Sequence, residues 1–136
     1  MATFKRPVVP RERIPDAAIA KWGLAVLSEG FVPFPKKLLR CLPAILGENG
    51  IEKLQVIMSI VDYLREDLKN PPSKDYLAFI AGLPKERFKA VLSELHANDL
   101  VDVSGTDEFF MANLKGLKDA ILSESAKADK ASDTPF

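Results

Sequence analysis

The apolar residues that begin at Ile51 recur at steps of three and four, the spacing that places side chains on one face of an α-helix. They predict a long helix from Ile51 to about Leu68, with a stripe wide enough to pack on more than one side, as in a central helix. Asn70, followed by two prolines, ends this helix, because the residue before a proline disfavours the helical conformation. The stripe consists of Ile51, Leu54, Ile57, Met58, Ile60, Val61, Leu64 and Leu68.

Two shorter helices are predicted next, joined by a turn at Gly82. Ser73 is a good N-cap for the first, at 74–81, and glycine readily adopts the left-handed conformation that ends a helix. Pro84 opens the second, which closes at Asn98, since proline suits a first helical turn. The apolar face of the first is Tyr76, Leu77 and Ile80, and that of the second is Phe88, Val91, Leu92 and Leu95.

A hairpin and a last helix complete the pattern. Strands are predicted at 100–103 and 108–111 around a turn at 104–107, and Asn113 caps a helix that ends near Ser123. Its inward residues are Leu114, Leu117, Ile121 and Leu122.

Proline shapes the first part of the chain. Three prolines in residues 1–15 predict an extended basic arm, and Asp16 caps a helix at 17–22, with 24–27 open to a strand instead. A short edge strand is expected at 31–34. A helix follows at 36–42, which Pro43 stops or kinks and on which Cys41 is a packed thiol.

The spacing within 77–92 is typical of a helix-turn-helix. Ala78 is small where two helices approach closely, Gly82 follows four residues later, and Phe88 and Val91 set the second helix across the first. With the hairpin after it, the predicted fold is mainly α with a small β-hairpin, a winged helix-turn-helix. The predicted organisation is a flexible arm at 1–15, a domain at 16–123 and a disordered tail at 124–136, with the helix-turn-helix at 73–98, the wing at 100–111 and the last helix at 113–123.

This pattern resembles the N-terminal winged-helix domains of phage replication protein O and of bacterial DnaD-type primosomal proteins. The likeness spans roughly residues 30–111 and includes the segment that leads into a Leu-Leu helix, carried by Gly30, Phe31, Pro35, Leu38 and Leu39. The resemblance implies DNA binding in replication initiation or in transcriptional control of a phage or mobile element. By that analogy the helix 84–98 lies in the major groove of double-stranded DNA.

The candidate DNA contacts are polar residues on the predicted outer faces. Arginine is suited to bidentate contact with guanine and lysine to point-charge contact with phosphate. The candidates are Lys85, Arg87, Lys89 and Ser93 on the second motif helix, Lys74 on the first, and Lys36, Lys37 and Arg40 upstream.

The charge distribution changes the emphasis. Residues 1–40 carry eight Lys/Arg against three Asp/Glu, a net charge of +5, whereas 73–98 carry four against three, and the wing tip holds Asp107 and Glu108 without a basic residue. Phosphate contacts dominate DNA affinity, so DNA binding would need the basic first forty residues.

The alternative is a winged helix used for protein–protein contact or self-association, with a homo-oligomer or a replication protein as partner. DnaD-type domains, which the chain resembles, are implicated in oligomerisation. Six aromatics, open also to ordinary core packing, favour this alternative: Phe4, Trp22, Phe31, Phe34, Phe109 and Phe110.

Other classes are not favoured. One histidine, His96, and one cysteine make no zinc set, and no glycine-rich phosphate loop is present, so we expect no enzyme, cofactor, metal or small-molecule substrate. No apolar run has the length of a membrane span, no secretory signal is evident, and a single cysteine fits a reducing cytoplasm. The residues 133–136 resemble the acidic tip, ending in Pro-Phe, of bacterial single-stranded-DNA-binding proteins, which docks into partners; an inert tail is the alternative.

Overall fold

The structure, a computed structural model, describes residues 4–63 and 70–131, the last four without their side chains. It divides the chain into two compact units, Met1–Pro33 and Phe34–Phe136. The division falls after Pro33, whereas the sequence was expected to divide after residue 15.

The first unit contains a 3₁₀ turn, η1 (Arg11–Arg13), and a helix, α1 (Asp16–Trp22). The predicted helix is confirmed, but Pro15 is its N-cap and the Asp16 carboxylate lies 3.0 Å from the guanidinium of Arg11. The Val9 amide donates to the Ser28 carbonyl at 2.8 Å, which ties the start of the unit to its end. This segment is therefore not an extended arm.

The strand predicted at 31–34 is not formed, and neither is the strand left open as an alternative at 24–27. Residues 24–27 form a turn, and residues 31–34 pair with no strand in the described part of the chain. A strand needs a ladder of backbone hydrogen bonds to a neighbouring strand, and neither segment has one in the described residues.

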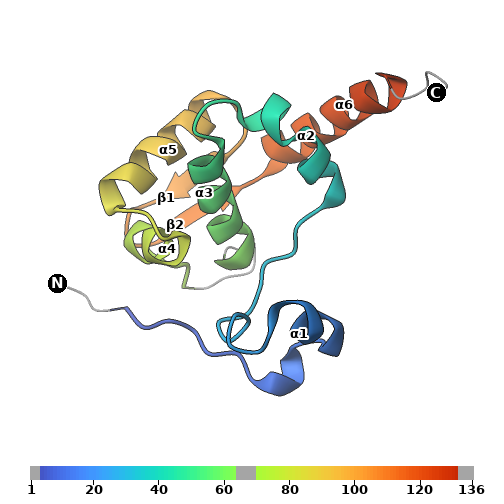
Figure 1. Ribbon diagram of the computed structural model, residues 1–136. Coiled ribbons are helices and arrows are strands. Elements are labelled where there is room, and N and C mark those ends of the chain that lie inside the picture. The colour runs from blue at the N-terminus through green and yellow to red at the C-terminus, as the bar shows by residue number, and fades with distance from the viewer. Residues whose placement is uncertain (1–3, 64–69, 132–136) are drawn as a thin grey trace. The chain divides into compact units, whose positions relative to one another are not determined.

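The second unit is mainly helical and carries one two-stranded antiparallel sheet, as predicted (Figure 1). Its elements are α2 (Lys36–Leu46), α3 (Gly50–Tyr63), α4 (Lys74–Ala81), α5 (Lys85–Ala97), β1 (Asp102–Gly105), β2 (Phe110–Asn113) and α6 (Lys115–Ala131). Helix α3 packs against α2, α4 and α5, and α6 runs alongside α2. The central position predicted for the long helix is confirmed.

Pro43 was expected to stop or kink this helix, and it does not stop it, because α2 continues through Pro43 to Leu46. Proline removes one backbone donor, and the added turn buries Leu46, which is 4% exposed. The ammonium of Lys53, itself buried, donates to the Leu46 carbonyl at 2.8 Å and satisfies an acceptor at the helix end. Cys41 is buried, as predicted.

The stripe of α3 is confirmed in its centre and wrong at its start. Ile57 and Ile60 are buried together with Val56, whereas Ile51 is 80% exposed. The predicted members Leu64 and Leu68 lie outside the described residues.

The turn between α4 and α5 follows the sequence closely. The Ser73 hydroxyl accepts from the Tyr76 amide at 3.1 Å, and Gly82 adopts φ 77°, ψ 25°, the left-handed conformation. Ala78 is 2% exposed, as expected for a close approach of two helices. All four apolar residues predicted for the inner face of α5 are buried: Phe88, Val91, Leu92 and Leu95.

The hairpin begins two residues later than predicted. Leu100 and Val101 belong to the buried core instead of to the first strand, and the Leu100 carbonyl accepts from the Leu117 amide at 2.9 Å. In the sheet, Asp102 pairs with Asn113 and Gly105 with Phe110, so the turn lies at 106–109. Core packing of two adjacent apolar residues overrides the alternation that the sequence displays.

Helix α6 begins after Asn113, whose side chain accepts from the Lys115 amide at 3.1 Å, as predicted. It runs to Ala131, eight residues beyond the expected end. Ser125 explains part of the extension, because it is buried and accepts a hydrogen bond from Arg40 of α2 at 3.0 Å. Gly116 lies so close to the Asp99 carbonyl that an added Cβ would overlap it.

Candidate interaction surfaces

A carboxylate of the hairpin forms ion pairs with one lysine of α4 and one lysine of α5. The Asp107 carboxylate lies 3.0 Å from the Lys74 ammonium and 2.9 Å from that of Lys89. Hydrogen bonds from Lys89 and then Lys74 lower the pKa of Asp107 to about 2, and the bond to Asp107 raises the pKa of Lys89. One negative charge is therefore shared between the two ammoniums, which it compensates in part.

The hairpin is also held by its backbone. The Lys74 amide donates to the Asp107 carbonyl at 2.8 Å, and the Phe110 amide donates to the Pro72 carbonyl at 3.1 Å. The Lys74 ammonium lies 5.3 Å from the centre of the Phe110 ring, within cation–π distance. The hairpin is thus fastened to the start of α4.

Arg87, the residue best suited to read a guanine, is bound by Glu52 of α3. Its Nε and Nη2 atoms donate to the two carboxylate oxygens at 2.7 and 2.8 Å, a bidentate pair. The side-chain hydrogen bond raises the pKa of Arg87 and lowers that of Glu52. On the same helix, Lys85 lies 3.2 Å from the carboxylate of Asp75.

Ser93 is exposed and lines a shallow hollow between α5 and the hairpin. The hollow has a volume of about 280 Å³, and Lys74, Lys89 and Asp107 line it as well. The structure therefore brings together Ser93, Lys74 and Lys89 of the predicted DNA contacts. We name the surface made of Lys74, Lys85, Arg87, Lys89 and their carboxylate partners the paired surface.

The upstream basic residues lie elsewhere. Lys36 and Lys37 are exposed at the start of α2 and, with Lys118 of α6, line a groove of about 420 Å³ whose other lining residues are Pro35, Ile121 and Leu122. We call it the α2–α6 groove. Arg40 does not join them, since its guanidinium donates to Ser125.

Sequence reasoning missed this groove and predicted Leu122 to point inward. Leu122 is 58% exposed, and Leu39 of α2 is 60% exposed. The signal was available in part, because Lys118 and Leu122 are four residues apart on one helical face.

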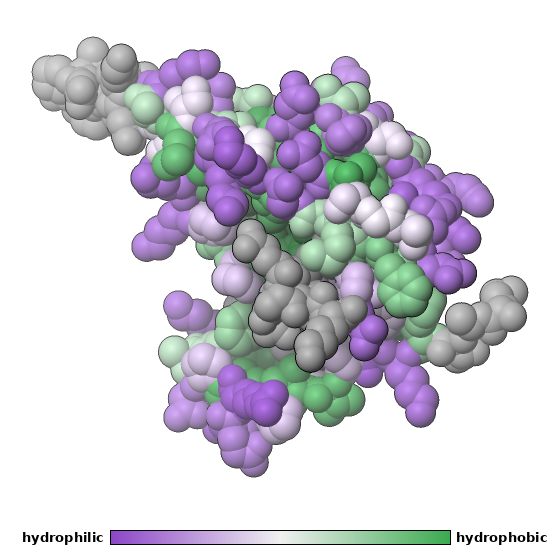
Figure 2. All heavy atoms as spheres, turned by 180° about the vertical axis from the view of Figure 1, so that it is seen from behind, coloured by the Kyte–Doolittle hydropathy of each residue, from purple (hydrophilic) through white to green (hydrophobic). Residues whose placement is uncertain are grey.

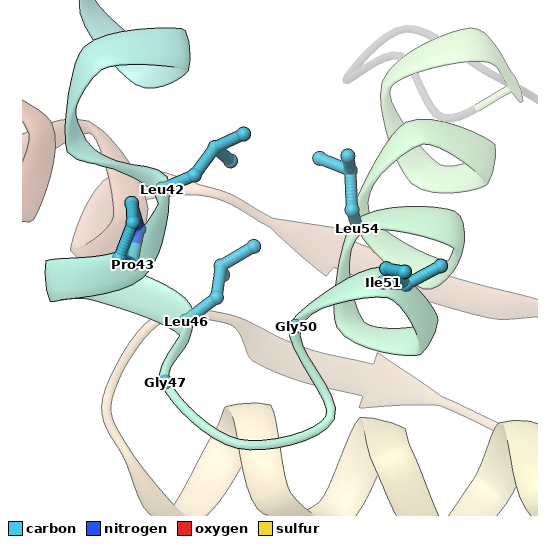
Figure 3. Close-up of a pocket in the computed structure, with 7 residues that line it drawn as sticks. All are labelled: Leu42, Pro43, Leu46, Gly47, Gly50, Ile51 and Leu54. Carbon is cyan, nitrogen blue, oxygen red and sulfur yellow. The ribbon is translucent and has the colours of Figure 1, made fainter.

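A second apolar groove, of about 360 Å³, lies between α2 and α3 (Figure 3). Figure 3 shows the side chains of Leu42, Leu46 and Leu54 pointing into the space between the two helices. Ile51 stands at its edge, which explains why this side chain is exposed although the helical pattern placed it inward.

The six aromatic residues differ in exposure, and Phe4 is half-buried. Phe110 is 1% exposed, in accordance with core packing, whereas Trp22, Phe31, Phe34 and Phe109 are 65%, 53%, 40% and 56% exposed. Figure 2 shows hydrophobic surface on one face of the molecule, interrupted by hydrophilic side chains. Trp22 and Phe31 belong to the first unit and Phe34 and Phe109 to the second, and aromatics exposed singly do not by themselves mark a contact surface.

No helix in the described residues has the length and apolarity needed to cross a membrane. Within the same residues, no cluster of three or more His, Cys, Asp or Glu side chains is arranged to hold a metal ion. Comparison with protein-family models, curated proteins and solved structures gave no match. The residues 133–136, with their likeness to an acidic docking tip, lie outside the described part of the chain.

Proposed function

We propose that the chain is a winged-helix module that acts by binding another protein. The winged-helix assignment rests on element order: α3, α4, a tight turn at Gly82, α5 and an antiparallel hairpin follow one another as in that fold. In this assignment α5 is the helix that a DNA-binding member would place in the major groove.

The observation that carries the protein-binding function is the pairing of the α4 and α5 cations. Lys74, Lys85, Arg87 and Lys89 each lie within 3.2 Å of a carboxylate. The paired surface therefore has little net positive potential to attract a phosphate backbone, whose binding depends on uncompensated cations. Displacing a bidentate carboxylate from Arg87 would in addition leave Glu52 facing the DNA.

Apolar exposure in the second unit supports the same function. Helix α2 borders both apolar grooves, and Leu39 on its surface is 60% exposed. The free energy falls when a protein partner covers apolar surface in a cleft. The DNA backbone has little apolar surface with which to cover it.

Binding of double-stranded DNA is the second candidate, favoured by the order of α3, α4, α5 and hairpin. It would use Lys74, Lys89 and Ser93 around the hollow, after release of Asp107. Its biological setting would be replication initiation or transcriptional control in a phage or mobile element, as the sequence resemblance implies.

A titration separates the two candidates. Labelled duplex DNA is titrated with the protein at about 50 and 200 mM salt, beside a triple variant Lys85→Ala, Arg87→Ala, Lys89→Ala. We expect the wild type to show no salt-dependent binding. Salt-dependent binding that the triple variant loses would overturn the protein-binding function and establish the second candidate.

A further inference from the structure

We propose that the α2–α6 groove binds an acidic segment of a partner protein that carries an apolar side chain between carboxylates. This inference rests on the proposed protein-binding function and names the chemistry of the partner. The groove lies within the second unit, and its volume of about 420 Å³ falls in the range of sites that take a few side chains.

The floor of the groove is apolar. Pro35 comes from the start of α2, and Ile121 and Leu122 come from neighbouring positions of α6. Leu122 is 58% exposed, a large fraction for a leucine next to other apolar residues. Covering it removes apolar surface from water, which favours binding.

The rim of the groove is cationic. Lys36, Lys37 and Lys118 line it, and no carboxylate of the described residues lies within ion-pair distance of any of them. Neighbouring lysines of α6 behave differently, because Lys115 pairs with Asp119 and Lys127 with Glu124. The groove is therefore the place where lysines gather without internal compensation.

The start of α2 adds to this positive potential. Its N-cap is Pro35, which offers no side-chain hydrogen bond, and its first turn contains no acidic residue. The amides at a helix start lack partners within the helix and favour a negative charge nearby. Three ammoniums, an uncapped helix start and an apolar floor thus converge on one groove.

An acidic segment with an apolar side chain satisfies all three features together. Carboxylates reach the lysines and the helix start, while a leucine or phenylalanine between them covers Ile121 and Leu122. A phosphate backbone satisfies the rim but leaves the apolar floor uncovered. The charge of the rim and the polarity of the floor together select the partner.

The test uses the full chain and a fluorescent synthetic peptide in which two leucines lie between aspartates and glutamates. A matched peptide carries asparagine and glutamine in place of the acids. We expect the acidic peptide to bind about ten-fold tighter than the matched one, and its affinity to fall as salt rises from about 50 to 200 mM. Equal affinity for the two peptides, or no binding, would overturn the proposal.

Variants locate the binding. Lys118→Glu and Leu122→Gln, both at exposed positions, are expected to weaken peptide binding by about ten-fold and about five-fold. Lys115→Glu on the same helix and Ile51→Ala at the α2–α3 groove are matched controls and should bind as the wild type does. Undiminished binding by Lys118→Glu and Leu122→Gln, with circular dichroism like that of the wild type, would sink the proposal.

Two further outcomes assign the groove to another occupant. Light scattering that shows self-association, lost in Lys118→Glu, would make the groove an interface between copies and overturn the acidic-partner proposal. Duplex DNA binding lost in the same variant would make it a phosphate site and overturn the proposed function as well. Failure of the peptide with no DNA binding overturns this inference alone, so the two failures are distinguishable.

Discussion

Two cationic regions of the second unit differ in whether their basic side chains form ion pairs with carboxylates of the same chain. On the paired surface each of four basic side chains lies against a carboxylate from α3, α4 or the hairpin. At the α2–α6 groove three lysines have no carboxylate within ion-pair distance among the described residues, and they line the groove together with Leu122, which is 58% exposed. A basic residue on a helix predicts an anionic partner only when the fold has not already supplied one.

The largest expected effect comes from displacing α6, which forms one side of the α2–α6 groove. Gly116→Ala places a methyl group against the Asp99 carbonyl, so α6 must shift from its place beside α2. We expect a loss of about 3 kcal/mol in the free energy of unfolding, the upper range for overpacking, measured by chemical denaturation. Peptide binding at the α2–α6 groove should be lost with it.

The matched control for this variant is Gly50→Ala. Gly50 has no left-handed conformation, and an added Cβ meets only the Leu46 Cβ at 3.6 Å, an ordinary contact. Its free energy of unfolding should stay within about 1 kcal/mol of the wild type. Equal stability of the two alanine variants would contradict the close approach at Gly116.

Removing the internal carboxylates should turn the paired surface into a phosphate-binding one. The double variant Glu52→Gln, Asp107→Asn frees Arg87, Lys74 and Lys89. We expect duplex DNA affinity to rise about ten-fold at low salt, with a plot of log K against log salt steeper by about 0.9 for each phosphate gained. Asp119→Asn, which frees Lys115 on α6, is the control; the comparison between the surfaces fails if both variants leave DNA binding unchanged.

The hydrogen bond between Arg40 and Ser125 is expected to hold the far end of α6 to α2. Arg40→Ala removes the donor and leaves the buried Ser125 hydroxyl without it, at a cost of about 1 kcal/mol in the free energy of unfolding. Lys37→Ala on the same helix removes a side chain without an ion pair in the described residues and should change stability by less than about 0.5 kcal/mol. Denaturation midpoints of the two variants make the comparison, and a larger loss in Lys37→Ala would contradict it.

The smallest effect concerns acid stability. Because the pKa of Asp107 in the folded chain is about 2, below its ordinary 3.8, its ion pairs stabilise the fold above pH 3.8 and are lost as the pH falls toward 2. Asp107→Asn should therefore lower the thermal midpoint slightly at pH 6 and by much less at pH 2, where about half of the wild-type Asp107 carboxyl groups are protonated. A difference between variant and wild type that is as large at pH 2 as at pH 6 would show that it does not come from these ion pairs.

The sequence predicted the fold better than the contacts of its charged residues. Local signals are sufficient where one residue sets the end of a helix, as Ser73 and Gly82 do for α4. They are also sufficient where a helical stripe of apolar residues faces the core, as in α5. They fail where distant segments decide. Leu100 and Val101 entered the core instead of the strand, and α2 passed through Pro43, because tertiary burial outweighs local preference.

The ion-pair partners could not be predicted from the sequence either, because they too come from distant segments. Arg87 and Glu52 are 35 residues apart, and Lys89 and Asp107 are 18 apart. No spacing rule connects such positions, whereas the i to i+4 pair of Lys115 and Asp119 on one helix follows from helical geometry. A count of charges along the chain therefore describes composition, while the potential of a surface depends on the fold.

The fastening of the hairpin to the start of α4 has a consequence for how the chain opens. The amides of Lys74 and Phe110 bond to carbonyls of the opposite segment, and they close a loop that contains α4, α5 and β1. Both bonds join the same two segments, so we expect the two amides to belong to one cooperative opening unit. Their hydrogen exchange should then report one common free energy of opening, and the tip of the hairpin should open together with the first turn of α4.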